Sequence, residues 1–389
     1  MSEPRPRARD LGIVIGTMTP GPFNAITDVS GVRVGHATII EGDGPLVVGR
    51  GPVRTGVTVV LPHAGDVWQQ PVFAAPHVLN GNGEMTGLEW VREAGMLGGP
   101  VGITNTHSVG VVRDALVAEG VASHPDGAFY WSLPVVGETW DGLLNDADGF
   151  HVRPEHVREA LDNARSGPVP EGSVGGGTGM ICHEFKGGIG TSSRRLVTSA
   201  GGWTVGVLVQ ANYGRRGLLR IDGVRVGEEI GLSEVPTPYR KESGPASRRL
   251  VDGPPRRRDG SIIIIVATDA PLLPGQCARL AQRAGLGLAR AGGVGATTSG
   301  DIFLAFSTGN LDLPTPETEH EPPGVTTVRM LVDTALDPLF EATVEATEEA
   351  IVNALVAAET MTGRDGIVAH RLPHDRLRAV MARFGRLRT

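Results

Sequence analysis

The chain has 389 residues, of which 40% are hydrophobic, and it carries 43 acidic and 36 basic side chains for a net charge of −7. This composition is ordinary for a globular protein with a substantial core, and the acidic balance gives no basic footprint for nucleic acid. The two cysteines, Cys182 and Cys277, indicate neither a disulfide framework nor a cysteine-based zinc site. With no apolar stretch near the roughly 20 residues that span a bilayer and no secretory signal, we expect a cytoplasmic protein without membrane partners.

Short apolar runs alternate with helical patterns along the chain. Strands are predicted where β-branched runs are bounded by Gly, Pro or Asp, at 57–61, 203–209, 262–266 and 302–306. Several of these runs are apolar on both faces, so we expect their sheets to be covered on both sides. The 56 glycines show no fixed period and indicate tight turns and close backbone approaches.

Helices are predicted mainly in the last third of the chain. One candidate covers 276–291, and a second begins at Pro338, where we expect Asp337 to act as the cap. A third is predicted by an i, i+3, i+4, i+7 apolar stripe formed by Leu377, Val380, Met381 and Phe384. The pattern is that of a mixed α and β protein.

Residues 233–259 differ from the rest of the chain. They are rich in Pro, Arg and Ser and have no apolar period, which predicts an exposed, mobile loop. This loop meets the apolar strand at Gly260–Ser261, so a serine is held by a rigid strand while the chain before it can bend.

This junction has the parts of a self-cleaving peptide bond. Attack of the Ser261 hydroxyl on the carbonyl of Gly260 would form an ester, which water can hydrolyse, and glycine obstructs such an attack least. Cleavage would free an α-amine with an unperturbed pKa of about 7.7–8.0, which suits a general base beside its own nucleophile. The dipeptide alone fits an ordinary loop-to-strand transition equally well, so the prediction needs independent support.

The support is a resemblance that extends over nearly the whole chain. RDGSIIIIVATDAPLLPGQ at 258–276 is similar to the processing site of the DmpA/BapA-type aminopeptidases, the L-aminopeptidase/D-esterase and β-aminopeptidyl family. Eight further motifs resemble this family, in order: AITDVSGVRVGHATI at 25–39, NGNGEMTGLEW at 80–90, PVGITNTHSVG at 100–110, PVVGETWDGLLND at 134–146, EGSVGGGTGMI at 171–181, VLVQANYGRRGLLRI at 207–221, TTSGDIFLAFST at 297–308 and EEAIVNALVAAE at 348–359.

The resemblance implies an α+β fold, a four-layer αββα sandwich of the DmpA/ornithine acetyltransferase type that resembles N-terminal-nucleophile hydrolases. It implies one domain over 1–389, cut into an α-chain 1–260 and a β-chain 261–389, with several αβ units in the mature assembly. The activity it implies is release of N-terminal residues from short peptides, amides or esters without a cofactor. Preferences within the family differ between L-, D- and β-residues.

The resemblance also assigns roles around Ser261. Asn212 matches the asparagine whose side-chain NH₂ faces the oxyanion, although it also fits a turn before Gly214. Trp140 stands where relatives carry tyrosine; its indole N–H could still donate to the oxyanion, or the ring could only form a wall of the pocket.

Three further residues complete the implied site. Glu138 would bind the free ammonium of the substrate, or it is a surface residue at a strand end. Ser299 and Asp301 would lie beside the nucleophile and its amine, with Asp301 pairing the ammonium form; the alternative is an S-G-D turn that enters a strand.

Other motifs exclude competing chemistry. The glycine cluster at 175–179 lacks the endings of phosphate-binding loops, so we interpret it as close-packed backbone near the site. His63, His77 and His107 do not form an HExxH pattern, so we expect no metal. Two alternatives stay open: an ornithine acetyltransferase-like acyltransferase, against which Ser261 argues because those enzymes use threonine, and an uncleaved, non-enzymatic binding or scaffold protein, which the change to Trp140 allows.

Overall fold

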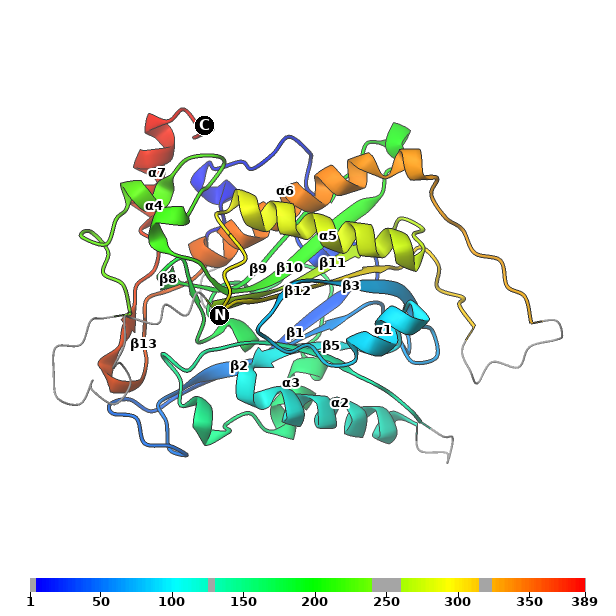
Figure 1. Cartoon of the computed structure of the whole chain (residues 1–389), viewed down its shortest axis with the longest axis horizontal. Coiled ribbons are helices and arrows are strands. Elements are labelled where there is room, and N and C mark those ends of the chain that lie inside the picture. The colour runs from blue at the N-terminus through cyan, green and yellow to red at the C-terminus, as the bar shows by residue number, and fades with distance from the viewer. Residues whose placement is uncertain (1–4, 125–129, 240–259, 315–323, 389) are drawn as a thin grey trace.

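Two β-sheets lie face to face at the centre of the molecule (Figure 1). The computed structural model describes residues 5–124, 130–239, 260–314 and 324–388. The six-stranded sheet has the order β4 (Met96–Leu97), β3 (Val72–Gly81), β12 (Gly300–Ser307), β11 (Gly260–Thr268), β10 (Thr204–Tyr213) and β9 (Gly188–Arg195). The four-stranded sheet has the order β1 (Arg33–Glu41), β2 (Val53–Leu61), β5 (Val101–Asn105) and β6 (Val135–Thr139).

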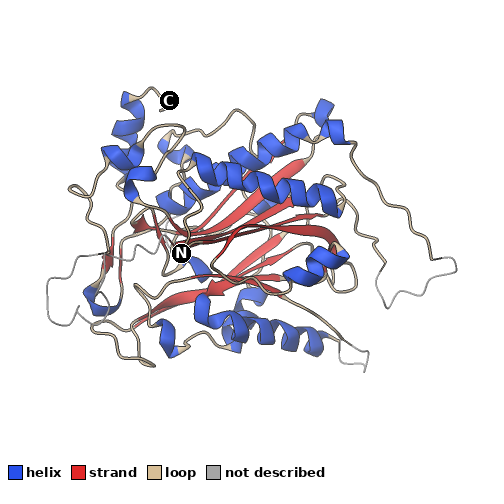
Figure 2. Cartoon of the chain, viewed as in Figure 1, coloured by secondary structure: helices blue, strands red, loops and turns tan. Residues whose placement is uncertain are grey.

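Helices cover the outer face of each sheet, which gives the four layers seen in Figure 2. The long helices α5 (Pro274–Arg290) and α6 (Asp337–Val356) lie on the six-stranded sheet, and α2 (Val109–Ser123) and α3 (Pro154–Asp162) lie on the four-stranded sheet. Smaller elements complete the fold: α1 (Leu88–Ala94), α4 (Val226–Glu229), α7 (His374–Arg383), the hairpin β7 (Ile181–Cys182) and β8 (Phe185–Lys186), and the hairpin β13 (Met361–Thr362) and β14 (Val368–Ala369). The predicted αββα sandwich is confirmed. None of the helices in the described parts of the chain combines the length and apolar character needed to cross a bilayer.

The strand β11 shows why the apolar run after Ser261 has no polar face. Successive side chains of a strand point to opposite faces. Ile262 and Ile264 pack into the core under α5 and α6, whereas Ile263 and Ile265 pack into the core between the two sheets. Both faces of the strand are therefore buried, as the sequence predicts.

The glycine cluster at 175–179 lies between the sheets, in contact with strands of both. A Cβ on Gly176 would lie 2.2 Å from Gln210 Oε1, and a Cβ on Gly179 would lie 2.3 Å from the carbonyl oxygen of Arg54. These distances are too short for any side chain, which confirms the prediction of close-packed backbone. Nearby, Gln210 donates to Thr104 O and Thr139 Oγ1, both at 2.9 Å, and so ties β10 to β5 and β6.

Three sequence predictions need correction. Leu336, not Asp337, is the N-cap of α6 and forms no side-chain cap, because the helix begins one residue earlier than the proline predicts. Phe384 follows α7 and is exposed instead of completing its apolar stripe. Of the predicted exposed loop, residues 240–259 lie outside the described residues. Within 233–239 four residues are exposed as expected, but Val235 is buried and Glu234 pairs with Arg376 at 2.6 Å.

Candidate active site

The strand β11 lies between β10 and β12 (Figure 1), and Ser261 is its second residue. Ser261 shares its strand face with Ile263 and Ile265, so its side chain faces the space between the two sheets. Only 6% of the residue is exposed, and its hydroxyl oxygen accepts a hydrogen bond of 3.0 Å from the Gly300 N–H. The hydroxyl is thus fixed by main-chain atoms of the neighbouring strand.

The residue before it, Gly260, occupies a position that excludes every other amino acid. Its φ is +70°, in the left-handed region that glycine adopts without cost. A Cβ on Gly260 would lie only 1.7 Å from the carbonyl oxygen of Asn212, on the paired strand β10. The Asn212 main chain therefore occupies the place where a side chain would otherwise stand, and the two backbones approach closely at the scissile bond.

Asn212 lies directly opposite Ser261 in the antiparallel pair of β10 and β11. Its side-chain oxygen accepts the Ile181 N–H at 2.8 Å, which fixes the amide orientation, and its NH₂ donates to the carbonyl of Trp140 at 2.9 Å. An amide NH₂ carries two hydrogens, and this contact uses one. The indole of Trp140 packs against Gly142 so closely that a Cβ on Gly142 would lie 2.6 Å from the ring.

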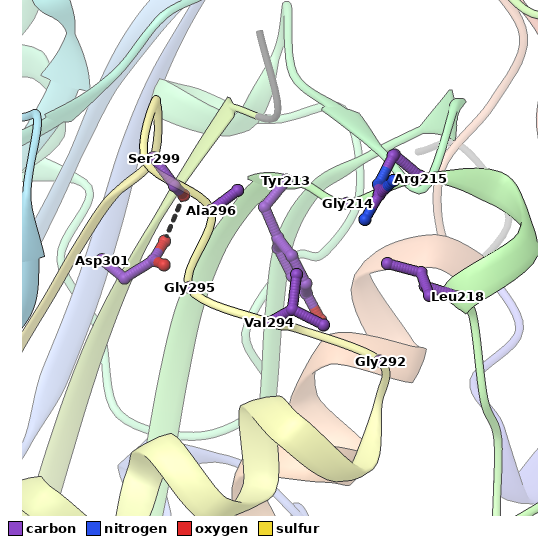
Figure 3. Close-up of a pocket in the computed structure, with 10 residues that line it drawn as sticks. All are labelled: Tyr213, Gly214, Arg215, Leu218, Gly292, Val294, Gly295, Ala296, Ser299 and Asp301. Atoms are coloured by element: carbon purple, nitrogen blue, oxygen red, sulfur yellow. Dashed lines mark hydrogen bonds between the residues drawn. The ribbon is translucent and has the colours of Figure 1, made fainter. Parts of the chain in front are cut away.

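Ser299 and Asp301 flank Gly300 at the start of β12. The Ser299 hydroxyl donates to Asp301 Oδ1 at 2.6 Å (Figure 3). Burial raises the pKa of Asp301 to about 6, although hydrogen bonds from Ser299, the Ile262 main chain and Asn80 act in the opposite direction. Both side chains line a small pocket together with Tyr213, Gly214, Arg215, Leu218, Gly292, Val294, Gly295 and Ala296.

The link between this pair and Ser261 runs through the main chain. Asp301 pairs with Ile262, whose side chain packs on the helix side of the sheet. Within the described residues, neither Ser299 nor Asp301 forms a hydrogen bond to the Ser261 hydroxyl, and the Gly300 N–H is the contact between them. Ser299 and Asp301 thus flank the strand end where the α-amine of Ser261 would be freed.

Glu138 is buried near the end of β6, the edge strand of the four-stranded sheet. Its carboxylate accepts hydrogen bonds from the Glu84 N–H at 2.9 Å and from the Thr106 hydroxyl. Burial raises the pKa of this carboxyl above its usual range, and the two hydrogen bonds oppose the shift. A Cβ built on Gly83 would lie 3.1 Å from Glu138 Oε1 and 3.0 Å from Gly300 Cα. Glu138 is therefore close to the start of β12, where the Gly300 N–H contacts Ser261.

The structure thus places Asn212 opposite Ser261, Trp140 against Asn212, and Glu138 near Gly300, whereas Ser299 and Asp301 are linked to Ser261 through the Gly300 main chain. Sequence reasoning missed Asn80, whose side-chain oxygen accepts the Asp301 N–H at 2.8 Å, and Thr106. Both stand inside the quoted motifs NGNGEM and TNTHS, which was the available signal. The main-chain N–H groups of Gly300 and Glu84, which donate to Ser261 and Glu138, could not be predicted because every residue except proline has such a group.

Comparison with known proteins identifies the family. The model of peptidase family S58 matches residues 24–369. The β-peptidyl aminopeptidase BapA of Sphingosinicella microcystinivorans is 50% identical over 382 residues, which cover 98% of this chain and 93% of that protein. The chain belongs to peptidase family S58.

Two solved structures superpose closely on the chain. A β-aminopeptidase of Burkholderia sp. has a TM-score of 0.87 at 54% identity, covering 98% of this chain and 99% of its own. The L-aminopeptidase D-Ala-esterase/amidase of Ochrobactrum anthropi, described as a prototype of the serine aminopeptidases with a variant Ntn hydrolase fold, has a TM-score of 0.84 at 45% identity, covering 98% and 100%. This S58 protein is accordingly a self-processing serine aminopeptidase with that fold. Neither the acyltransferase nor the scaffold alternative is supported.

Proposed function

We propose that Ser261 is the nucleophile of this aminopeptidase and that cleavage of the Gly260–Ser261 bond frees it. The observation that carries the proposal is the geometry of the junction: a glycine at φ +70° with no room for a side chain, followed by a serine whose hydroxyl is held by the Gly300 N–H. The chain would divide into 1–260 and 261–389. The two parts would stay together because β11 pairs with β10 over its whole length.

Self-cleavage needs only groups already present and water. The Ser261 oxygen bonds to the Gly260 carbonyl carbon, the C–N bond breaks, and the amine takes the hydroxyl proton. Water then hydrolyses the ester, which leaves the Gly260 carboxylate, the Ser261 hydroxyl and a free α-amine. Asn212, across the strand pair from Ser261, carries the NH₂ that would stabilise the oxyanion.

The same groups would serve turnover. The α-amine of Ser261 acts as the base for its own hydroxyl, and the acyl-enzyme forms while Asn212 stabilises the oxyanion. Trp140 supports Asn212 through its main-chain carbonyl, and its half-buried indole against Gly142 forms a wall of the site. Ser299 and Asp301 pair with the ammonium form of the new terminus and keep its position.

The substrates we infer are small peptides, amides and esters with a free amino group, including β-aminoacyl compounds, since the similar enzymes are named for that activity. A panel of L-, D- and β-aminoacyl p-nitroanilides tests the inference directly. Hydrolysis of the β-aminoacyl members supports it, and activity confined to blocked or internal peptide bonds contradicts it. We further propose a cytoplasmic assembly of several αβ units.

Glu138 is the proposed ligand of the substrate ammonium. Replacing it with glutamine removes the charge but keeps the shape, so a charge-assisted hydrogen bond worth about 1.5–3 kcal/mol is lost. We expect kcat/KM to fall by roughly 10- to 100-fold, with normal self-cleavage because that reaction involves no free ammonium. Glu89→Gln, an exposed glutamate on α1, is the matched control. Unchanged kcat/KM in Glu138→Gln would remove Glu138 from the site.

The buried carboxyls predict an acid limb in the pH profile. Burial raises the pKa of Asp301 to about 6 and also raises that of Glu138. Asp301 must be ionised to act, so it should add one protonation step to the fall of kcat/KM near pH 6, beyond the step of the α-amine that acts as the base. Asp301→Asn should remove this step near pH 6 and lower the maximum. Asp269→Asn changes a partly buried acid beyond the far end of β11 and should keep the wild-type profile. An unchanged pH profile in Asp301→Asn contradicts the assignment.

A further inference from the structure

One short segment connects the two halves of the site. Residues 80–86, the inter-sheet strap, leave the six-stranded sheet where Asn80 pairs with Asp301 and reach the edge of the four-stranded sheet, where Met85 bridges Gly137. There Thr86 exchanges two hydrogen bonds of 3.0 Å with Val136. The strap thus connects β12, the strand next to the one that carries Ser261, with β6, the strand that carries Glu138.

At the first end, two asparagines hold the loop before β12. Asn80 accepts the Asp301 N–H at 2.8 Å and donates to the Ala296 carbonyl at 2.9 Å. Asn82 donates to the Thr298 carbonyl at 2.7 Å. These bonds fix the loop 296–301, which presents the Gly300 N–H to the Ser261 hydroxyl.

At the second end, the strap holds the carboxylate of Glu138 through the Glu84 N–H at 2.9 Å. Gly83 stands between the two ends. A Cβ on Gly83 would lie 3.0 Å from Gly300 Cα and 3.1 Å from Glu138 Oε1, closer than ordinary van der Waals contact. Gly83 therefore lies between Glu138 and the Gly300 backbone with little room for a side chain of its own.

We propose that the inter-sheet strap sets the distance between the Glu138 carboxylate and Ser261, and thereby selects the number of backbone atoms between the amino group and the carbonyl of the substrate. This inference rests on the proposed function, in which Glu138 binds the ammonium and Ser261 attacks the carbonyl. Within the strap, the positioning and specificity-determining residues are Asn80, Asn82, Gly83 and Glu84, because their contacts reach Glu138 or the loop that carries Gly300.

Gly83→Ala tests the inference because the added methyl would lie about 3 Å from both Gly300 Cα and Glu138 Oε1, so the Glu138 carboxylate or the Gly300 backbone must shift away from it. The probes are the p-nitroanilides of glycine and β-alanine, which differ only by one methylene between amine and carbonyl. We expect the β-alanine to glycine ratio of kcat/KM to rise by at least about fivefold, since a wider gap favours the longer backbone. Gly81→Ala is the matched control: its Cβ meets nothing nearer than 4.0 Å, so the ratio should stay within about twofold of wild type.

Asn80→Ala provides a second test if Gly83→Ala fails to fold. It detaches the strap from the loop 296–301, so the wild-type preference between the two probes should shrink by at least about fivefold. Intact mass should show normal cleavage in the variants. A cleaved, active Gly83→Ala enzyme with the wild-type ratio, or with a ratio shifted toward glycine, overturns the role of the strap. Failure of the proposed function would look different, as activity that survives loss of the Ser261 hydroxyl.

Discussion

Ser261→Ala should remain a single uncut chain with no measurable aminopeptidase activity. The variant lacks both the hydroxyl that attacks the Gly260 carbonyl and the hydroxyl that would form the acyl-enzyme, so the two reactions fail together. By comparison with other serine hydrolases, the loss in kcat should be on the order of 10⁴-fold or more. Denaturing electrophoresis and intact mass measure cleavage, and release of p-nitroaniline measures activity.

The conservative variant Ser261→Thr is the control, because threonine keeps a nucleophilic hydroxyl. It should still cleave, more slowly, since its extra methyl enters a buried position that is 6% exposed in the native chain. Fragments of the wild-type masses from Ser261→Ala would mean that another residue attacks. Residual hydrolysis by that variant would place the nucleophile elsewhere.

Gly260→Ala should block or strongly slow self-cleavage even though the nucleophile is intact. Alanine is strained at a φ of +70°, a cost of roughly 1–3 kcal/mol, and its Cβ would overlap the Asn212 carbonyl oxygen at 1.7 Å. The backbone must move away from Asn212 to relieve this contact, which takes the scissile carbonyl out of position. We expect the cleavage rate, followed by intact mass over time, to fall by at least about tenfold.

Two comparisons separate this effect from general instability. Gly275→Ala, at the start of α5, introduces a Cβ with no atom within 4 Å and should cleave at the wild-type rate. Any Gly260→Ala molecules that do cleave should have normal kcat and KM, because residue 260 is then only a chain end. Rapid cleavage of Gly260→Ala would show that the close approach of Gly260 to the Asn212 main chain is not required.

Much of this arrangement could be predicted from residues alone. The β-branched run after Ser261 predicts a strand buried on both faces, and Ile262 and Ile263 pack into two different cores. The glycine cluster at 175–179 lies between the sheets as expected. That Glu138, Asn212 and Asp301 belong to one site could be predicted only from the ordered family motifs, because their separation in the sequence does not indicate that they are close in space.

Two kinds of contact could not be predicted from the sequence: hydrogen bonds from main-chain N–H groups, and contacts between segments that are far apart in the chain. The Gly300 and Glu84 amides hold the two key side chains, and any residue has such an N–H. The position of Asn212 between Ile181 and Trp140 depends on how a hairpin and a strand end meet in space. The start of α6 at Asp337 was shifted by one residue because proline is tolerated at the second helical position as well as the first.

The central claim is that the chain cuts itself at Gly260–Ser261 to expose Ser261, and intact mass of the purified wild-type protein with N-terminal sequencing tests it most directly. Two fragments are predicted, one ending at Gly260 and one beginning Ser-Ile-Ile-Ile-Ile. A fully active protein that stays in one piece, or a second fragment that begins at another residue, would contradict it.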